Sequence, residues 1–229
     1  MSERQPILGV LLLETRFRRI PGDIGNPETF SFPVIYHVVA GADVERVVLR
    51  GGDEGLVPLF VEAGEVLQER GADLIAASCG FLSRFQGEIA RALRVPFLSS
   101  SLLQLPWLCR VFGHDSPVGI VTASESSLGE AHFKGVGAEG IPVRIAGMDT
   151  CDHFRGAILT EEIPLNPARL RGEVLNVARG LVDRDPEISA LVLECTNLSP
   201  YRNDIRDAVG RPVFDIVTLI ESCLLGFTR

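Results

Sequence analysis

The segment ALVLECTNLSPY, residues 190–201, begins with a short apolar run and continues into Cys195 and small polar side chains. The segment ADLIAASCGFLSRF, residues 72–85, has the same order, because its apolar run ends at Ser78 and Cys79. A continuous apolar run of about four to eight residues is typical of a parallel strand that is buried on both faces. Both segments therefore predict a buried strand with a thiol at its carboxyl end.

Short apolar runs alternate with longer amphipathic runs on either side of these two segments. We expect strands at residues 7–13, 74–78, 95–100, 117–123, 142–147, 190–194 and 212–215. We expect helices at residues 53–71, 81–93, 127–140, 166–184, 201–209 and 216–227. This alternation predicts an α/β fold in which parallel sheets are flanked by helices. The longest segment without such a pattern, residues 15–42, is expected to be irregular.

The spacing around the two thiols repeats along the chain. Cys79 lies 17 residues before Pro96, and Cys195 lies 17 residues before Pro212. An internal duplication of a strand–thiol–helix–strand unit explains this repeat. It predicts two similar lobes, each with a small parallel sheet, rather than one sheet of six strands.

The predicted lobes divide the chain into two nearly equal parts. The first lobe comprises residues 1–102 plus 216–229 and carries Cys79. The second lobe comprises residues 103–215 and carries Cys195. Ligands of open α/β sheets bind beyond the carboxyl ends of the strands, so we expect the site in a cleft between the lobes.

The composition limits the partners that we expect. The chain has 229 residues, a net charge of -8 and a pI of about 5.1, which disfavours nucleic acid and anionic membranes as partners. The apolar stretch before Glu14 is too short to span a membrane. Five cysteines without regular spacing predict free thiols in a reduced, cytoplasmic protein. Lys134 is the only lysine and lies at an expected helix end, which argues against a pyridoxal phosphate enzyme.

Cysteines at the carboxyl ends of two equivalent strands are candidates for catalysis. Cys79 and Cys195 each directly precede an expected helix, whose N-terminus lowers the pKa of a thiol. A pseudo-twofold axis would bring the two thiols face to face across the cleft. A racemase needs such a pair, because one group removes a proton from one face of a carbon and the other returns it to the opposite face. We therefore expect one thiolate and one thiol at rest.

The segments GADLIAASCGFL, VGIVTASESS and LECTNLSPY resemble the aspartate/glutamate/hydantoin racemase superfamily, and the resemblance covers most of the chain. It implies two flavodoxin-like α/β lobes, an active site between them and no cofactor. It places Cys79 and Cys195 on the two catalytic thiols of a racemase or epimerase. It also implies a homodimer or a higher homo-oligomer.

The resemblance further implies which groups surround the substrate. Thr122, Ser124 and Thr196 are expected to bind its α-carboxylate. Backbone N–H groups at Gly80 and Asn197 are expected to stabilise the negative charge that develops during proton transfer.

One motif departs from the amino-acid racemases, which usually carry Cys-Asn-Thr at the first thiol. Here Cys79 is followed by Gly80 and Phe81, so two polar groups give way to a glycine and an aromatic ring. This change favours a larger, more apolar or cyclic substrate, such as a hydantoin, over aspartate or glutamate. Three further candidates for substrate contact lie in the irregular segment: Asp23, Gly25 and Asn26.

Two other functions are compatible with the same residues. In a maleate-type cis–trans isomerase one thiol adds to a double bond, and such an enzyme also has both thiols. A non-catalytic relative would bind a small ligand in the same cleft. The expected ligand is a small carboxylate or imide in each case.

The other cysteines and the histidines have simpler interpretations. Packing accounts for the remaining thiols, Cys109, Cys151 and Cys223. The four histidines are scattered and lack the spacing of a metal site, so no metal is expected.

Overall fold

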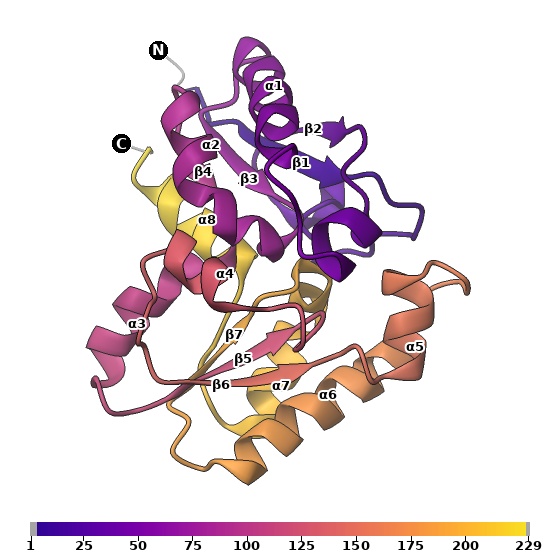
Figure 1. Cartoon of the computed structure of the whole chain (residues 1–229), viewed down its shortest axis with the longest axis vertical. Coiled ribbons are helices and arrows are strands. Elements are labelled where there is room, and N and C mark those ends of the chain that lie inside the picture. Colours follow the sequence, from indigo (N-terminus) through magenta and orange to yellow (C-terminus); the bar gives the residue numbers. More distant parts are fainter. Residues whose placement is uncertain (1–3, 228–229) are drawn as a thin grey trace.

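The computed structural model describes residues 4–227, and within them the strands form two separate four-stranded parallel sheets (Figure 1). The first sheet has the order β2 (Val34–Val39), β1 (Leu8–Leu13), β3 (Leu74–Ala77), β4 (Phe97–Leu98). The second has the order β6 (Val143–Gly147), β5 (Val118–Thr122), β7 (Ala190–Leu193), β8 (Val213–Phe214). The predicted α/β fold of two similar lobes is confirmed.

The two sheets are built in the same way around the thiols. β1 pairs with β3 from Leu8 and Leu74 onward, and β5 pairs with β7 from Val118 and Ala190 onward. Every residue of β3, β5 and β7 is buried, as the continuous apolar runs predict. Because the strands are parallel, the carboxyl ends of β3 and β7 present the two cysteines at equivalent edges.

Eight α-helices connect and cover the strands of the described chain. They are α1 (Leu56–Glu69), α2 (Gln86–Ala92), α3 (Leu105–Phe112), α4 (Glu130–Gly135), α5 (Asp152–Phe154), α6 (Pro167–Arg184), α7 (Arg202–Val209) and α8 (Ile216–Leu225). Short 3-10 helices are η1 (Pro27–Thr29), η3 (Gly80–Phe85), η4 (Ser101–Gln104) and η6 (Thr196–Tyr201), and π-helical turns are η2 (Glu45–Leu49) and η5 (Arg155–Leu159). The Asn166 side chain caps α6 by accepting hydrogen bonds from two backbone N–H groups.

Two local expectations are wrong. Residues 15–42 are not wholly irregular, because they contain β2, an edge strand whose residues are mostly half-buried and so lack a continuous apolar signature. The helix expected from residue 53 starts later, because α1 has Gly55 as its N-cap. The Asp53 carboxylate binds Arg46 and the backbone N–H of Gly55.

The last helix returns to the first sheet. Ile216, Ile220 and Leu224 of α8 belong to one apolar cluster with Leu8 and Leu74 of that sheet. In Figure 1 α8 accordingly lies beside the strands of the first lobe, close to the start of the chain.

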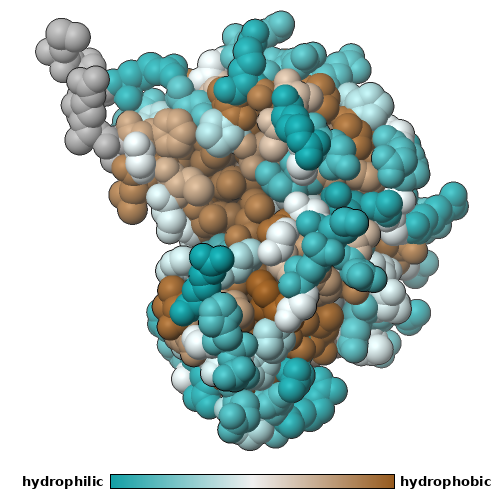
Figure 2. Space-filling model, turned by 60° about the vertical axis from the view of Figure 1, so that its left-hand side comes forward, coloured by the Kyte–Doolittle hydropathy of each residue, from teal (hydrophilic) through white to brown (hydrophobic). Residues whose placement is uncertain are grey.

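Apolar side chains are also gathered on one face of the surface, as Figure 2 shows. Large exposed apolar residues include Trp107 and Val111 of α3, and Leu225 and Phe227 at the end of α8. Within residues 4–227, no helix combines the length and the apolar character that a bilayer crossing requires.

Candidate active site

The two predicted thiols line one pocket between the lobes. Cys79 and Cys195 are only 8% and 6% exposed, and each occupies the N-cap position of a six-residue 3-10 helix. The cavity itself has a volume of about 30 Å³, and the space between protein atoms reaches about 380 Å³ only when the open solvent at its mouth is included. Its apolar lining includes Leu13, Phe17 and Phe81. Both thiols line this cavity, which as it stands admits about two water-sized groups.

The pKa values of both thiols are raised, whereas the sequence predicted that they would be lowered. Burial, and secondly the charge of Glu194, raise the pKa of Cys79 to about 12. Burial and the same carboxylate also raise the pKa of Cys195 well above its usual value. The short helices that follow do not offset the loss of hydration, which disfavours the charged thiolate. Both thiols are therefore protonated at rest, rather than one thiol and one thiolate.

Glu194 is a charged residue of the pocket that was not predicted from the sequence. It is fully buried, lines the pocket and directly precedes Cys195. Its Oε2 accepts a hydrogen bond from Thr122 Oγ1 at 2.7 Å, whereas its Oε1 has no hydrogen-bond partner among the described residues. Burial raises the pKa of Glu194 to about 7. The signal was present in the sequence, since an acidic residue at the end of a buried strand needs a reason to be there.

Gly80 makes room for this carboxylate. A Cβ atom at Gly80 would overlap both Oε1 and the backbone oxygen of Glu194. The departure from Cys-Asn-Thr at the first thiol thus has a steric cause, because any side chain here would displace Glu194.

The loop between β1 and β2 supplies the cation of the site. Arg19 is the one cationic side chain among the described residues that line the pocket, and Glu194 is the one anionic side chain. Arg19 Nη1 donates to Asp23 Oδ1 at 2.9 Å, and Nη2 donates to Thr15 Oγ1 at 3.2 Å. The guanidinium also lies over the ring of Phe17, 4.9 Å from its centroid. Arg19 does not stand out in the sequence, because a lone arginine in a loop resembles an ordinary surface residue.

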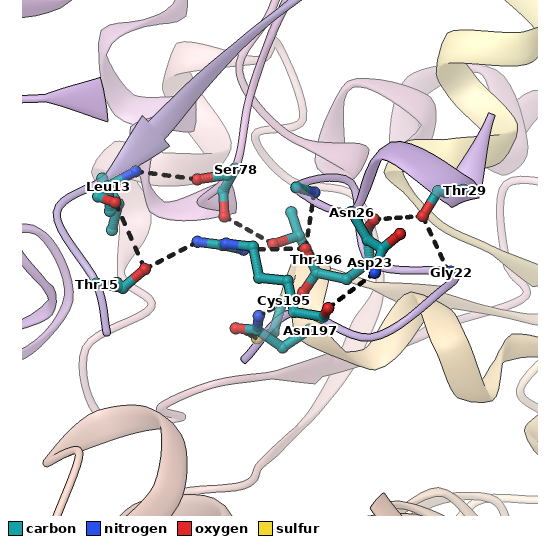
Figure 3. Close-up of polar contacts among 12 residues, drawn as sticks. Leu13, Thr15, Gly22, Asp23, Asn26, Thr29, Ser78, Cys195, Thr196 and Asn197 are labelled. Carbon is teal, nitrogen blue, oxygen red and sulfur yellow. Dashed lines mark hydrogen bonds and ion pairs between the residues drawn. The ribbon is translucent and has the colours of Figure 1, made fainter. Parts of the chain in front are cut away.

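A hydrogen-bonded chain links this loop to the second thiol, as Figure 3 shows. Asn197 Nδ2 donates to Asp23 Oδ2 at 2.7 Å, and Cys195 Sγ donates to Asn197 Oδ1 at 3.6 Å. Asp23 also accepts from the backbone N–H of Gly25 at 2.8 Å. Asn26 turns away from the pocket, because its side chain donates to a backbone oxygen of the loop and caps η1. The loop therefore acts on the site through Arg19 and Asp23.

A second polar link joins the two thiol segments directly. Thr196 Oγ1 donates to the backbone oxygen of Ser78 at 2.6 Å, and Ser78 Oγ accepts from the backbone N–H of Leu13 at 3.1 Å. These bonds tie the residue after one thiol to the residue before the other. They fix the distance between the lobes at the pocket.

The remaining predicted residues divide into two groups. The pocket lining includes Gly80, Phe81, Thr196 and Asn197. Thr122 and Ser124 are buried and do not line the pocket. Thr122 donates to Glu194, and Ser124 contacts Ser126 and Ser127. Thr122 thus reaches the site only through Glu194.

An acidic groove adjoins the pocket and shares its lining residues Thr15, Val44 and Leu159. In the described chain, the charged residues that line the groove are one arginine, Arg16, and four carboxylates: Glu14, Asp43, Glu45 and Glu161. Glu161 comes from the second lobe and accepts hydrogen bonds from the backbone N–H of Arg16 in the first lobe, at 3.0 and 3.1 Å. The groove therefore crosses the junction of the lobes beside the thiols.

The other cysteines lie apart from this site. All five cysteines are free thiols, and the pocket lining does not include Cys109, Cys151 or Cys223. In the described part of the chain, no group of three or more His, Cys, Asp and Glu side chains is arranged to hold a metal ion.

Comparisons with known proteins identify relatives for this architecture. A family model described as Asp/Glu/Hydantoin racemase matches residues 108–220. A dimethylsulfoniopropionate lyase of Durusdinium sp. clade D is 31% identical over 226 residues, which are 96% of this chain and 74% of the relative. Dimethylsulfoniopropionate lyase 3 of Emiliania huxleyi is 30% identical over 96% of this chain and 59% of its own length. The chain thus spans about three quarters or less of these curated relatives.

Solved structures share the fold at low sequence identity. An arylmalonate decarboxylase has a TM-score of 0.59 and 15% identity, with 91% of this chain and 85% of that chain covered. An allantoin racemase from Pseudomonas fluorescens has a TM-score of 0.59 and 16% identity, with 96% and 89% covered. At this identity the likeness concerns the fold alone.

Proposed function

The chain belongs to the Asp/Glu/hydantoin racemase superfamily of enzymes, and we propose that it removes a proton from the carbon beside a carboxylate and eliminates a leaving group. The substrate that we propose is dimethylsulfoniopropionate or a close analogue. One observation carries the proposal: two buried thiols share a small apolar pocket with a single arginine. The lyases that are 30% and 31% identical to this chain support elimination over racemisation as the outcome.

The elimination uses one thiolate and no other reagent. The thiolate takes a proton from the carbon next to the carboxylate, and the electron pair of that C–H bond forms a double bond to the next carbon. The bond from that carbon to the sulfonium breaks, and the sulfur departs with the bonding electrons as neutral dimethyl sulfide. Acrylate and a protonated thiol remain. A thiolate and a sulfonium thus lose their charges together, which a pocket of low polarity favours.

The substrate itself helps to form the base. Both thiols have raised pKa values in the free protein, so a bound cation would lower them toward neutral pH, and the thiol that ionises loses its proton to solvent. Of the two, we assign Cys79 as the base. The charge of Arg19 lowers the pKa of Cys79, whereas Cys79 and Asp23 add to the effect of Glu194 in raising that of Cys195.

Racemisation is the second candidate, and the equivalent positions of the thiols after β3 and β7 favour it. The two reactions make different demands on the thiols. The carbon that loses the proton in dimethylsulfoniopropionate carries two hydrogens and is not a stereocentre, so elimination needs one base. Racemisation needs a base on each face.

The test is to incubate the protein in heavy water with dimethylsulfoniopropionate and, separately, with single-enantiomer amino acids and hydantoins. We expect dimethyl sulfide in the headspace and acrylate by NMR, and neither from a Cys79→Ala/Cys195→Ala variant. Deuterium uptake and inversion in an amino acid or hydantoin, without any sulfide, would assign racemisation instead. Thermal stabilisation by a compound that undergoes neither change would indicate a binding protein.

Arg19→Gln is expected to raise KM for the substrate by about 30-fold or more, because it removes the charge that binds the carboxylate. A shift of the pH–rate curve to higher pH should accompany this loss, since Arg19 also lowers the pKa of Cys79. Steady-state kinetics between pH 6 and pH 9 measure both effects. The matched control is Arg18→Gln, which removes an exposed charge from the same loop. An unchanged KM in the Arg19 variant would remove this arginine from the binding site.

A further inference from the structure

We propose that the unpartnered carboxylate oxygen of Glu194 binds the positively charged end of the substrate, so that the pocket selects zwitterions with a methylated onium group. This inference rests on the proposed function for the identity of the pocket as the substrate site. It identifies Glu194 as the residue that recognises the cation, and methylated onium groups as the chemical class of that cation.

Glu194 has the geometry of a binding group rather than of a structural one. Oε2 is held by Thr122, and Oε1 lies against Gly80, between the segments that carry the two thiols. A buried carboxylate without a counter-charge is costly in free energy, so natural proteins retain one where a ligand uses it. Only burial and hydrogen bonds from Thr122 and Ala123 account for its pKa of about 7, and no cationic side chain of the described residues contributes.

Arg19, the arginine of the pocket, pairs with Asp23 and not with Glu194. Arg19 is paired with Asp23, and two of its five N–H groups are used by Asp23 and Thr15. Its other N–H groups can receive a carboxylate. The pocket thus has a cationic pole at Arg19 and an anionic pole at Glu194, which matches a small zwitterion.

The walls of the pocket distinguish between kinds of cation. Phe17, Phe81 and Ile158 are among the apolar side chains that surround the thiols. A primary ammonium has three N–H donors to satisfy, whereas Glu194 offers one unpartnered oxygen. A sulfonium or quaternary ammonium has no donor, is weakly hydrated and packs its methyl groups on aromatic rings. The site therefore suits methylated onium groups better than amino acids.

The acidic groove next to the pocket also favours a ligand with a positive charge. Its four carboxylates lie next to the pocket and come from both lobes. They outnumber Arg16, the single cation among the described residues of the groove, and a surface on which one sign of charge predominates raises the local concentration of ions of the opposite sign. Cations are therefore concentrated at the edge of the pocket that Thr15, Val44 and Leu159 share with the groove.

The test compares two ligands of the same shape that differ in charge. 3-(Trimethylammonio)propionate carries a cation where 4,4-dimethylpentanoate carries a neutral carbon. Calorimetry should show that the wild-type protein binds the ammonium ligand about 10- to 100-fold more tightly. Glu194→Gln should bring the two affinities within about threefold of each other, and Glu65→Gln, on the exposed face of α1, should leave the preference intact.

The pH dependence provides a second measurement on the wild-type protein. An ionised Glu194 binds a cation and a protonated one does not, so affinity for the ammonium ligand should rise about tenfold from pH 6 to pH 8. Because a bound cation also lowers the pKa values of Cys79 and Cys195, the same rise must appear in a Cys79→Ala/Cys195→Ala variant to be assigned to Glu194. The nearby charges of Arg19 and Asp23 are paired with each other. The neutral ligand should show no such rise.

Thr122→Val provides a variant of nearly unchanged shape, should Glu194→Gln fail to fold. It removes the hydrogen bond that lowers the pKa of Glu194, so the rise in affinity should move to higher pH. A preference for the cation that survives in Glu194→Gln, or a flat pH profile, would overturn the inference even if the protein eliminates dimethyl sulfide. Failure of elimination with the cation preference intact would instead overturn the proposed function alone.

Discussion

Cys79→Ala is expected to lower kcat/KM for elimination by about a thousandfold or more, and Cys195→Ala by about 10- to 100-fold. The first change removes the group that accepts the proton. The second removes a neighbour whose contact with Asn197 helps to hold the pocket in shape. Release of dimethyl sulfide by each variant, measured under subsaturating substrate, gives the comparison. The unequal response follows from a reaction that needs only one base.

Equal and complete loss in both variants would contradict this assignment and favour a two-base scheme. Cys223→Ala is the matched control, because it removes a half-buried thiol of α8 outside the pocket. It should retain wild-type turnover. Thermal unfolding of all three variants separates a chemical role from a loss of folded protein.

Gly80→Ala is expected to destabilise the protein by about 2–4 kcal/mol and to abolish most of its activity. The new Cβ atom would overlap the side chain and the backbone oxygen of Glu194, and a backbone oxygen at the end of a buried strand has no room to move. The clash would also shift the neighbouring Cys79. Denaturant unfolding and the elimination assay measure the two consequences.

Two further variants sharpen this prediction. Gly129→Ala is the control, because a Cβ atom there would meet no atom within 4 Å, and its stability should change little. Adding Glu194→Ala to Gly80→Ala should restore only part of the stability, since the backbone oxygen remains. Full recovery in the double variant would show that the side chain alone had been responsible.

Local sequence patterns were sufficient to predict the two lobes and the cysteines. The apolar runs that end at Cys79 and Cys195 lie on central or near-central strands, where burial on both faces leaves a clear pattern. β2 has no such pattern, because it lies at an edge and is half-buried. A continuous apolar run thus identified the strands that precede the two thiols, and the lack of one explains why β2 was not predicted.

The charged residues of the pocket depend on contacts between distant segments. Arg19 reaches the thiols only because its loop folds over the junction of the lobes and is fixed there by the bond from Asp23 to Asn197. Thr122 was expected at the carboxylate of a substrate and instead binds Glu194. The prediction that the thiol pKa values are lowered was wrong for a related reason. A helix N-terminus is visible in a sequence, whereas the burial that outweighs it is a tertiary property.

The protonated state of the buried thiols has a consequence for the lifetime of the enzyme. Acrylate is an electrophile that alkylates thiolates, so a lyase that releases it is exposed to inactivation by its own product. With a pKa of about 12, fewer than about one Cys79 in ten thousand is a thiolate at neutral pH in the empty pocket. The nucleophile is formed only while a cationic substrate occupies the site. The positive charge of the substrate disappears when neutral dimethyl sulfide forms. The thiol that faces acrylate is then protonated and does not react with it.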